Sequence, residues 1–279
     1  QTVSRLWRDQ IEVFLAPGRV NLVRSARGFK PVQLAKVAVL CERVPGVPIW
    51  ESALRQLEEK LGDAASTELA ITLSNHFVRY VALPPQAEIT SPEEVMSYAT
   101  FRMREVYAER VDSWVLSVSE WSPVNGAVCA AIPRDLMVRV EEMAVRYQFK
   151  LKEIEPYLAS AYDRWQKLLR GNKIYFVVIE SGRICVALLI NGIWYSIRNQ
   201  RILQNVADEL LAALDQEAVL SGNKEAVELV HLFAPEHPDL TLPENCGWRI
   251  VPIQTGQIPV LAHYPTVPTD YAGINQCLA

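Results

Sequence analysis

The sequence lacks any apolar run long enough to cross a membrane, and it lacks concentrated charge of either sign. Its densest apolar runs, IYFVVI and ICVALLI, have the length of β-strands, well short of the roughly 18 residues that a spanning helix needs. The formal net charge is −4, with acids and bases scattered along the chain. Without a basic stripe or a polybasic run, the sequence argues against binding to nucleic acid or to an anionic membrane surface.

Cysteine and histidine are scarce and scattered. The five cysteines lie far apart, and none forms a CxxC or Cys/His pair with the spacing of metal ligands. The four histidines lie in separate segments, without a partner at the spacing of a catalytic triad. We interpret the cysteines as free thiols in a reducing compartment. The start of the chain, QTVSRLWRDQ, lacks the apolar core of a signal peptide, so we expect a cytoplasmic protein without a metal site.

What the sequence does contain is one pattern of three strands, present twice. Residues 10–41 give IEVFL, RVNLVR and VQLAKVAVL, and residues 173–199 give KIYFVVIE, RICVALLI and GIWYSIRN. In each copy a glycine followed by arginine lies in the first turn, which is ordinary turn chemistry. The residues of these two turns are Ala16, Pro17, Gly18 and Arg19 in the first copy and Glu180, Ser181, Gly182 and Arg183 in the second.

Helices and further strands follow each meander. Apolar spacing predicts helices over 49–61 and 203–221, the second ending at Gly222. Between the two copies, SPEEVMSYATFRMREVY has an N-cap serine, a proline at the first helical position and acids in the first turn, which indicates a helix start. We interpret ELAITLS and FVRYVALP as a strand pair, and SWVLSVSEW and AVCAAI as a hairpin around Asn125-Gly126.

Each half therefore has the order βββ-α-β, which predicts an α/β protein with helices packed on mixed sheets. A duplication at this scale predicts two lobes with a cleft between them. We expect the first lobe at residues 1–168, with an inserted α+β subdomain at about 86–155, and the second at 169–260. The remainder, 261–279, contains two prolines and is predicted to be a surface loop.

This order of elements resembles the actin-like (ribonuclease H-like) ATPase fold, and more narrowly the bacterial assembly proteins of type IV pili and type II secretion. Those proteins are the PilM family, the MshI-type pilus proteins and the cytoplasmic domain of GspL. The resemblance covers residues 10–255 approximately. It is carried by VRYVALPP followed by SPEEVMSYATFRMREV, by VCAAIPRDLMVRVEEMAVRYQFKLKEIEP, and by VVIESGRICVALLINGIWYSIRN.

In ATP-holding members of this fold, the turn after the first strand of each lobe holds the phosphates. Glycine lets backbone N–H groups approach the phosphate oxygens, and an aspartate holds Mg²⁺. Here Ala16 stands where the first acid is expected, Pro17 lacks a backbone donor, and Glu180 is one methylene longer than aspartate. The segment expected near adenine, 230–240, contains no glycine. The resemblance therefore implies a degenerate nucleotide site, with the eight turn residues as vestigial phosphate-loop positions and with no catalytic residue and no cofactor.

The roles of the turn arginines, of Glu180 and of the tryptophans each have two interpretations. Arg19 and Arg183 are either solvated hairpin arginines or ligands of an anion in the cleft. Glu180 is either a residual metal ligand or base, or a carboxylate that accepts hydrogen bonds from nearby N–H groups. The seven tryptophans are either core residues or, at a lobe junction, anchors for a partner.

The resemblance implies a non-catalytic scaffold, cytoplasmic and peripheral to the inner membrane, of a pilus or type II secretion platform. Its expected partner is the cytoplasmic tail of a bitopic membrane protein, held in the first lobe against residues 70–150 approximately. We expect no insertion of this chain into the membrane, and homo-oligomerisation stays open. The alternative is a working ATPase or small-molecule kinase of the actin/sugar-kinase superfamily, which uses ATP and Mg²⁺ with Glu180 as the acid and Arg19 compensating for lost metal charge.

Overall fold

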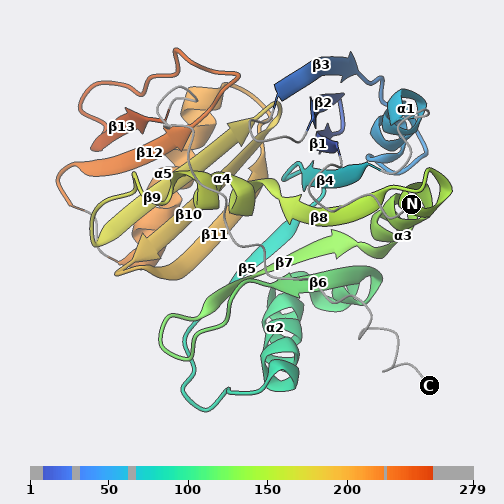
Figure 1. Cartoon of the computed structure of the whole chain (residues 1–279). Helices are drawn as coiled ribbons and strands as arrows, with labels where there is room; N and C mark the ends of the chain where they lie inside the picture. The colour runs from blue at the N-terminus through green and yellow to red at the C-terminus, as the bar shows by residue number, and fades with distance from the viewer. Residues whose placement is uncertain (1–8, 27–31, 62–66, 223–224, 254–279) are drawn as a thin grey trace.

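The computed structural model describes residues 9–26, 32–61, 67–222 and 225–253. Its strands form two sheets of five strands, which lie next to each other, and a separate sheet of three strands (Figure 1). The first sheet contains β1 (Gln10–Ala16), β2 (Arg19–Ala26), β3 (Val32–Leu40), β4 (Glu68–Leu73) and β8 (Lys150–Pro156). The second contains β9 (Lys173–Glu180), β10 (Arg183–Ile190), β11 (Ile193–Arg201), β12 (Glu228–Phe233) and β13 (Trp248–Pro252).

The two large sheets have the same topology. Their strand orders are β3-β2-β1-β4-β8 and β11-β10-β9-β12-β13. In each sheet the first strand of the meander pairs antiparallel with the second strand and parallel with the strand that follows the crossover helix. The duplication that the sequence predicts is therefore confirmed strand by strand, and it gives an α/β molecule of two kindred lobes.

The third sheet lies outside this repeat. It has the order β5-β7-β6, with β5 at Arg79–Leu83, β6 at Trp114–Val118 and β7 at Ala127–Pro133. The predicted hairpin of β6 and β7 is confirmed. The predicted pairing of ELAITLS with FVRYVALP is wrong, because β4 pairs with β1 and β8 whereas β5 pairs with β7. The strand β8, expected within the insert, likewise lies in the first sheet beside β4.

Helices lie beside all three sheets. They are α1 (Glu51–Leu61), α2 (Pro92–Tyr107), the 3-10 helix η2 (Ala108–Ser113), α3 (Arg134–Arg146), α4 (Tyr157–Trp165) and α5 (Val206–Ser221). The predicted start of α2 is confirmed by a capping box, in which the Ser91 hydroxyl accepts from the Glu94 N–H and the Glu94 carboxylate accepts from the Ser91 N–H. Gly222 ends α5 with a φ of 69°, the left-handed conformation that glycine adopts without strain.

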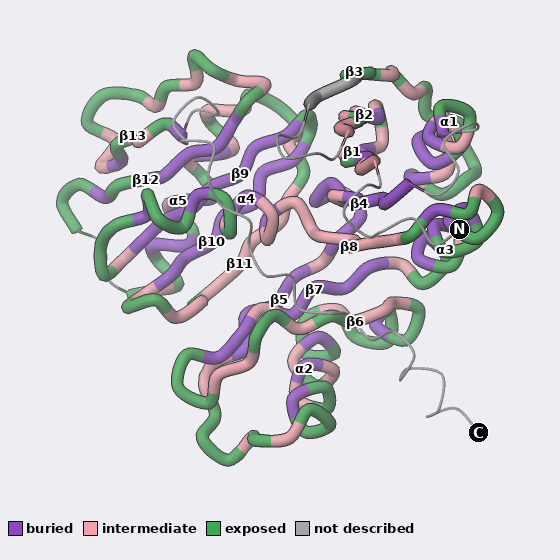
Figure 2. Tube along the Cα trace, in the orientation of Figure 1, coloured by how far each residue is buried: buried purple, intermediate pink, exposed green. Residues whose placement is uncertain are grey.

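The largest core is shared by the two lobes. It joins Leu15 of β1 and Leu73 of β4 to Trp165 of α4, and it continues into Val178 and Cys185 of the second sheet. Figure 2 shows these buried segments running through the strands of both large sheets. The opposite face of the second sheet packs on α5, and the third sheet packs on α2. Because the shared core crosses the lobe boundary, we expect the two lobes to unfold together.

No helix within the described residues combines the length and the apolar character needed to span a membrane. The expected tail at 261–279 lies outside the described residues, and the lobe boundary at 168/169 stays a prediction.

Candidate functional site at the junction of the lobes

The eight turn residues singled out in the sequence lie in two structurally equivalent turns. Ala16 pairs with Arg19 at the end of the β1–β2 hairpin, and Glu180 pairs with Arg183 at the end of the β9–β10 hairpin. Since β1 and β9 hold the same place in their sheets, the turns correspond to each other. Their assignment as vestigial phosphate-loop positions stays a prediction.

Glu180 is buried, and its carboxylate accepts hydrogen bonds from the opposite lobe. The residue is 2% exposed. One carboxylate oxygen accepts from the Ser74 hydroxyl at 2.5 Å, and the other accepts from the backbone N–H of Asn75 at 2.8 Å. Burial raises the pKa of Glu180 to about 7, although these two hydrogen bonds act in the opposite direction. These hydrogen bonds come from Ser74 and Asn75 of the opposite lobe, and not from the N–H groups next to Glu180 in its own turn, as one of the two interpretations expected.

The turn that receives Glu180, residues 74–78, is held from several sides. The side-chain oxygen of Asn75 accepts from the Tyr80 hydroxyl at 2.7 Å and from the Leu158 N–H at 3.2 Å. From the second lobe, the Asn199 amide donates to the backbone oxygens of Asn75 at 2.8 Å and Val78 at 3.0 Å. This turn therefore connects the first lobe, helix α4 and the second lobe in one hydrogen-bond network.

His76 adds a further contact between the lobes. Its Nε2 lies 2.8 Å from the backbone oxygen of Ser181. Burial lowers the pKa of His76 to about 4, so the ring is neutral near pH 7. A carbonyl oxygen can only accept, so the neutral ring donates through Nε2–H.

A charge from the second lobe and aromatic rings from both lobes lie around the first turn. Arg19 forms an ion pair with Glu236, in the loop that follows β12. Glu236 lies within residues 230–240, the segment expected near adenine. The ring of Tyr157, at the start of α4, lies 4.8 Å from the ring of Phe14 and 6.1 Å from that of Phe233, measured between centroids. Burial raises the pKa of Tyr157, which keeps its hydroxyl neutral.

The two arginines of the turns differ in their surroundings. Arg19 lies in the ion pair with Glu236, with its side chain 29% exposed, whereas Arg183 is 5% exposed. Arg183 is therefore not a solvated hairpin arginine, whereas Arg19 is partly exposed and paired with an acid of the opposite lobe. Within the described residues, no group of three or more His, Cys, Asp or Glu side chains is placed to hold a metal ion.

Several residues of this junction were not singled out in the sequence as site residues. They are Ser74, Asn75, Tyr157, Asn199 and Glu236. One signal was present, since a Ser-Asn pair directly follows the apolar strand ELAITL, and polar residues at the carboxyl end of a parallel strand often face a site. The others come from distant parts of the chain and carry no local signature.

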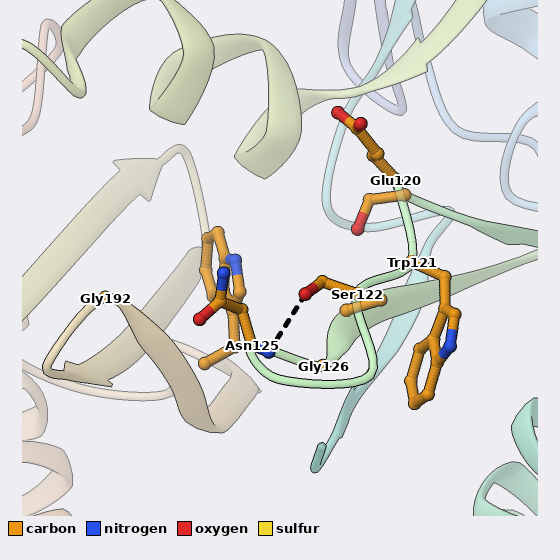
Figure 3. A pocket seen from close by; sticks show the side chains of 9 residues that line it. Glu120, Trp121, Ser122, Asn125, Gly126 and Gly192 are labelled. Carbon is orange, nitrogen blue, oxygen red and sulfur yellow. Dashed lines mark hydrogen bonds between the residues drawn. The ribbon is translucent and has the colours of Figure 1, made fainter. Parts of the chain in front are cut away.

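A cavity of about 410 Å³ lies between the hairpin of the third sheet and the β10–β11 turn. Figure 3 shows its wall, in which the Ser122 hydroxyl accepts from the Asn125 N–H at 3.1 Å. The Trp121 indole points away from Gly192 (Figure 3) and donates to the Ile89 backbone oxygen at 3.0 Å. Trp194 and the ionisable Glu120 also line this cavity.

No protein-family model matches the sequence, and no curated protein sequence matches it either. Solved structures do match. A PilM–PilN type IV pilus biogenesis complex matches with a TM-score of 0.59 and 15% identity, over 90% of this chain and 89% of that chain. The cytoplasmic domain of EpsL, an inner membrane component of the type II secretion system of Vibrio cholerae, matches with a TM-score of 0.54 and 13% identity, over 88% and 90%.

A third match is a protein of unknown function with the actin-like ATPase fold from Bacteroides thetaiotaomicron. Its TM-score is 0.56 at 10% identity, over 83% of this chain and 84% of that chain. At such identities the likeness establishes the fold. The chain has the two-lobed actin-like ATPase fold, as its sequence predicts. A pilus assembly protein and a cytoplasmic domain of a secretion protein are among the similar structures, in agreement with the resemblance drawn from the sequence.

Proposed function

We propose that this chain is a non-catalytic cytoplasmic scaffold, peripheral to the inner membrane, in a bacterial pilus or type II secretion assembly platform. It binds the cytoplasmic tail of a bitopic membrane protein of that platform. The observation that carries the proposal is the use of Glu180, whose carboxylate is bonded to Ser74 and Asn75 across the lobes. The similarity to a PilM–PilN complex and to the cytoplasmic domain of EpsL supports the assembly role.

The chemistry of the two turns disfavours magnesium-bound ATP between them. A carboxylate anchors Mg²⁺ only when its oxygens face the ion, and those of Glu180 already accept hydrogen bonds from the first lobe. The first turn offers Ala16 in place of an acid, and Pro17 has no N–H to donate. The ring of Tyr157 and the ion pair of Arg19 with Glu236 also lie at this junction. A scaffold of this fold therefore needs no cofactor.

The partner's tail is placed against the insert, within residues 70–150 approximately. The cavity beside Glu120 opens on this part of the chain. Cytoplasmic segments next to membrane spans carry an excess of lysine and arginine. The cavity offers the negative charge of Glu120, together with amide and hydroxyl groups, which complement a basic tail.

Two measurements on the full chain test the proposal. The first is fluorescence anisotropy with a labelled synthetic peptide of the cytoplasmic tail of the bitopic protein encoded beside this chain's gene, with a scrambled peptide as control. We expect a dissociation constant on the order of 10 µM or lower, and equal binding of the scrambled peptide would contradict the proposal.

The second measurement compares the melting temperature with and without millimolar Mg-ATP. We expect no rise that depends on magnesium. A ligand that binds the folded state stabilises it by mass action, so a rise of several degrees with Mg-ATP that is lost with ATP in EDTA would favour the ATPase or kinase alternative.

A further inference from the structure

Three arginines gather at the edge of the junction. Arg183 is the first residue of β10, and Arg201, the last residue of β11, lies directly opposite it. Residues directly opposite on antiparallel strands project from the same face of the sheet. Arg79 starts β5 and donates through one guanidinium nitrogen to the backbone oxygens of His76 at 3.3 Å and Val78 at 2.9 Å.

Shared hydrogen-bond partners bring Arg79 close to Arg183. Arg79 donates to the Val78 backbone oxygen, which also accepts from the Asn199 amide, and Arg183 donates to the Asn199 side-chain oxygen. Burial lowers the pKa of Arg183, and Arg79 and Arg201 lower it further. The same three arginines contribute to the low pKa of the neighbouring His76 ring. Three strands, β5, β10 and β11, therefore direct like charges toward one region.

Little negative charge balances this cluster. Within the described ranges of the chain, the ion pairs do not include Arg79, Arg183 or Arg201. The acid that acts on Arg183 is Glu180, whose oxygens are bonded to Ser74 and Asn75. Burial lowers the pKa of Arg79, Tyr107 and Tyr80 raise it, and the positive charge of Arg110 lowers it further, as that of Arg201 does.

The buried guanidinium group of Arg183 has few hydrogen-bond acceptors around it. Arg183 is 5% exposed, and its Nε is buried without a hydrogen-bond partner. Its remaining described hydrogen bond, to the side-chain oxygen of Asn199, is 3.4 Å long. A buried donor of a charged group left without an acceptor is destabilising, and so are like charges directly opposite on neighbouring strands. An anion at this position would relieve both effects.

We propose that Arg79, Arg183 and Arg201 form a binding site for a phosphate group. A phosphate monoester carries about two negative charges and three acceptor oxygens, which suits guanidinium groups that arrive from three strands, whereas a single carboxylate is matched by one arginine fork. Arg183 is the buried member of this site, and Arg201 is its exposed member. The site is made of side chains on β5, β10 and β11, needs no magnesium, and is independent of the proposed scaffold function.

The test measures binding of inorganic phosphate to the full chain by isothermal titration calorimetry at constant ionic strength. We expect binding by the wild type and a loss of about tenfold or more in affinity for Arg201→Gln, since one charge-assisted hydrogen bond is removed. Arg201 is exposed, so this variant is expected to fold, with a melting temperature in chloride buffer no lower than that of the wild type. Arg249→Gln is the matched control, because Arg249 is exposed on β13, at the opposite edge of the same sheet. We expect the affinity of this variant for phosphate to equal that of the wild type.

Two further ligands identify the source of the phosphate. If adenosine monophosphate, without magnesium, binds as inorganic phosphate does, the site takes the phosphate end of a larger molecule. Binding of inorganic phosphate alone indicates free phosphate, and either result supports the site. Equal affinity of the wild type and Arg201→Gln for phosphate would overturn the proposal, and so would sodium glutamate binding as tightly as phosphate.

Discussion

The substitution Glu180→Gln tests whether a neutral carboxyl group is the form that the junction prefers. Glutamine has the shape of protonated glutamate. Its carbonyl can accept from the Asn75 N–H and its amide can donate to the Ser74 hydroxyl, in place of the bonds at 2.8 and 2.5 Å. The variant therefore keeps the contact between the lobes while it removes the ionisable group.

The expected effect follows from the pKa of Glu180. Burial raises this pKa from 4.5 to about 7, so the folded state holds the proton more tightly than the unfolded state does. The stability that this proton contributes is complete below pH 4.5 and is lost as the pH rises to about 7. A tenfold change in the proton dissociation constant is worth about 1.4 kcal/mol, which gives about 3 kcal/mol over this window. We expect equal stability at low pH, and Glu180→Gln more stable by up to about 3 kcal/mol at pH 8.

The assay is urea unfolding of the wild type and the variant between pH 4.5 and 8, followed by tryptophan fluorescence, with the buried Trp165 as a reporter of the shared core. The difference in unfolding free energy between the two proteins isolates Glu180 from other buried acids, such as Glu155, whose pKa is also raised to about 7 by burial. A difference that stays constant with pH would refute the reasoning. A wild type that gains stability over the variant as the pH rises would show that the ionised carboxylate is the preferred form.

Two further predictions concern the insert. A Cβ on Gly126 would lie 2.0 Å from the Leu83 backbone oxygen at a φ of +72°, whereas one on Gly192, at +80°, would meet nothing within 4 Å. By urea unfolding, we expect Gly126→Ala to lose at least about 2 kcal/mol more than Gly192→Ala, and equal losses would contradict the steric argument. In the anisotropy assay, we expect Glu120→Arg to weaken tail binding about tenfold. The control is Glu109→Arg, on η2 outside the cavity, which is expected to leave tail binding unchanged. Equal weakening by both variants would assign the effect to net charge alone.

Much of the fold could be predicted because its signals are local. Strand-length apolar runs separated by glycine turns at Gly18 and Gly182 define each meander, and the structure has strands and turns at these places. The Ser-Pro-Glu-Glu start of α2 is equally local. The pairing of β4 with β1, and of β5 with β7, was not predictable in this way. Adjacent strands usually form a hairpin, but here the turn at 74–78 carries the chain from one sheet to another.

The candidate site was predictable at its turns and unpredictable in its contacts. The Glu180 turn is visible in the sequence, but the Ser74 hydroxyl that binds its carboxylate is 106 positions away. The amide of Asn199 reaches Asn75 across 124 positions. A single sequence has no periodicity at that range, so only the fold shows that the carboxylate faces hydrogen-bond donors of the opposite lobe.

The two equivalent turns have similar backbones but differ in the charges that surround their arginines. Each turn ends in an arginine, and the sequence gives no reason to treat Arg19 and Arg183 differently. In the structure, the loop after β12 brings Glu236 to Arg19, so the charge of the first turn is neutralised across the lobes. Arg183 meets Arg201 on the neighbouring strand, and its pKa falls because of burial and like charge. Within the described residues, positive charge is therefore in excess at the second turn, which is where an anion gains the most from binding.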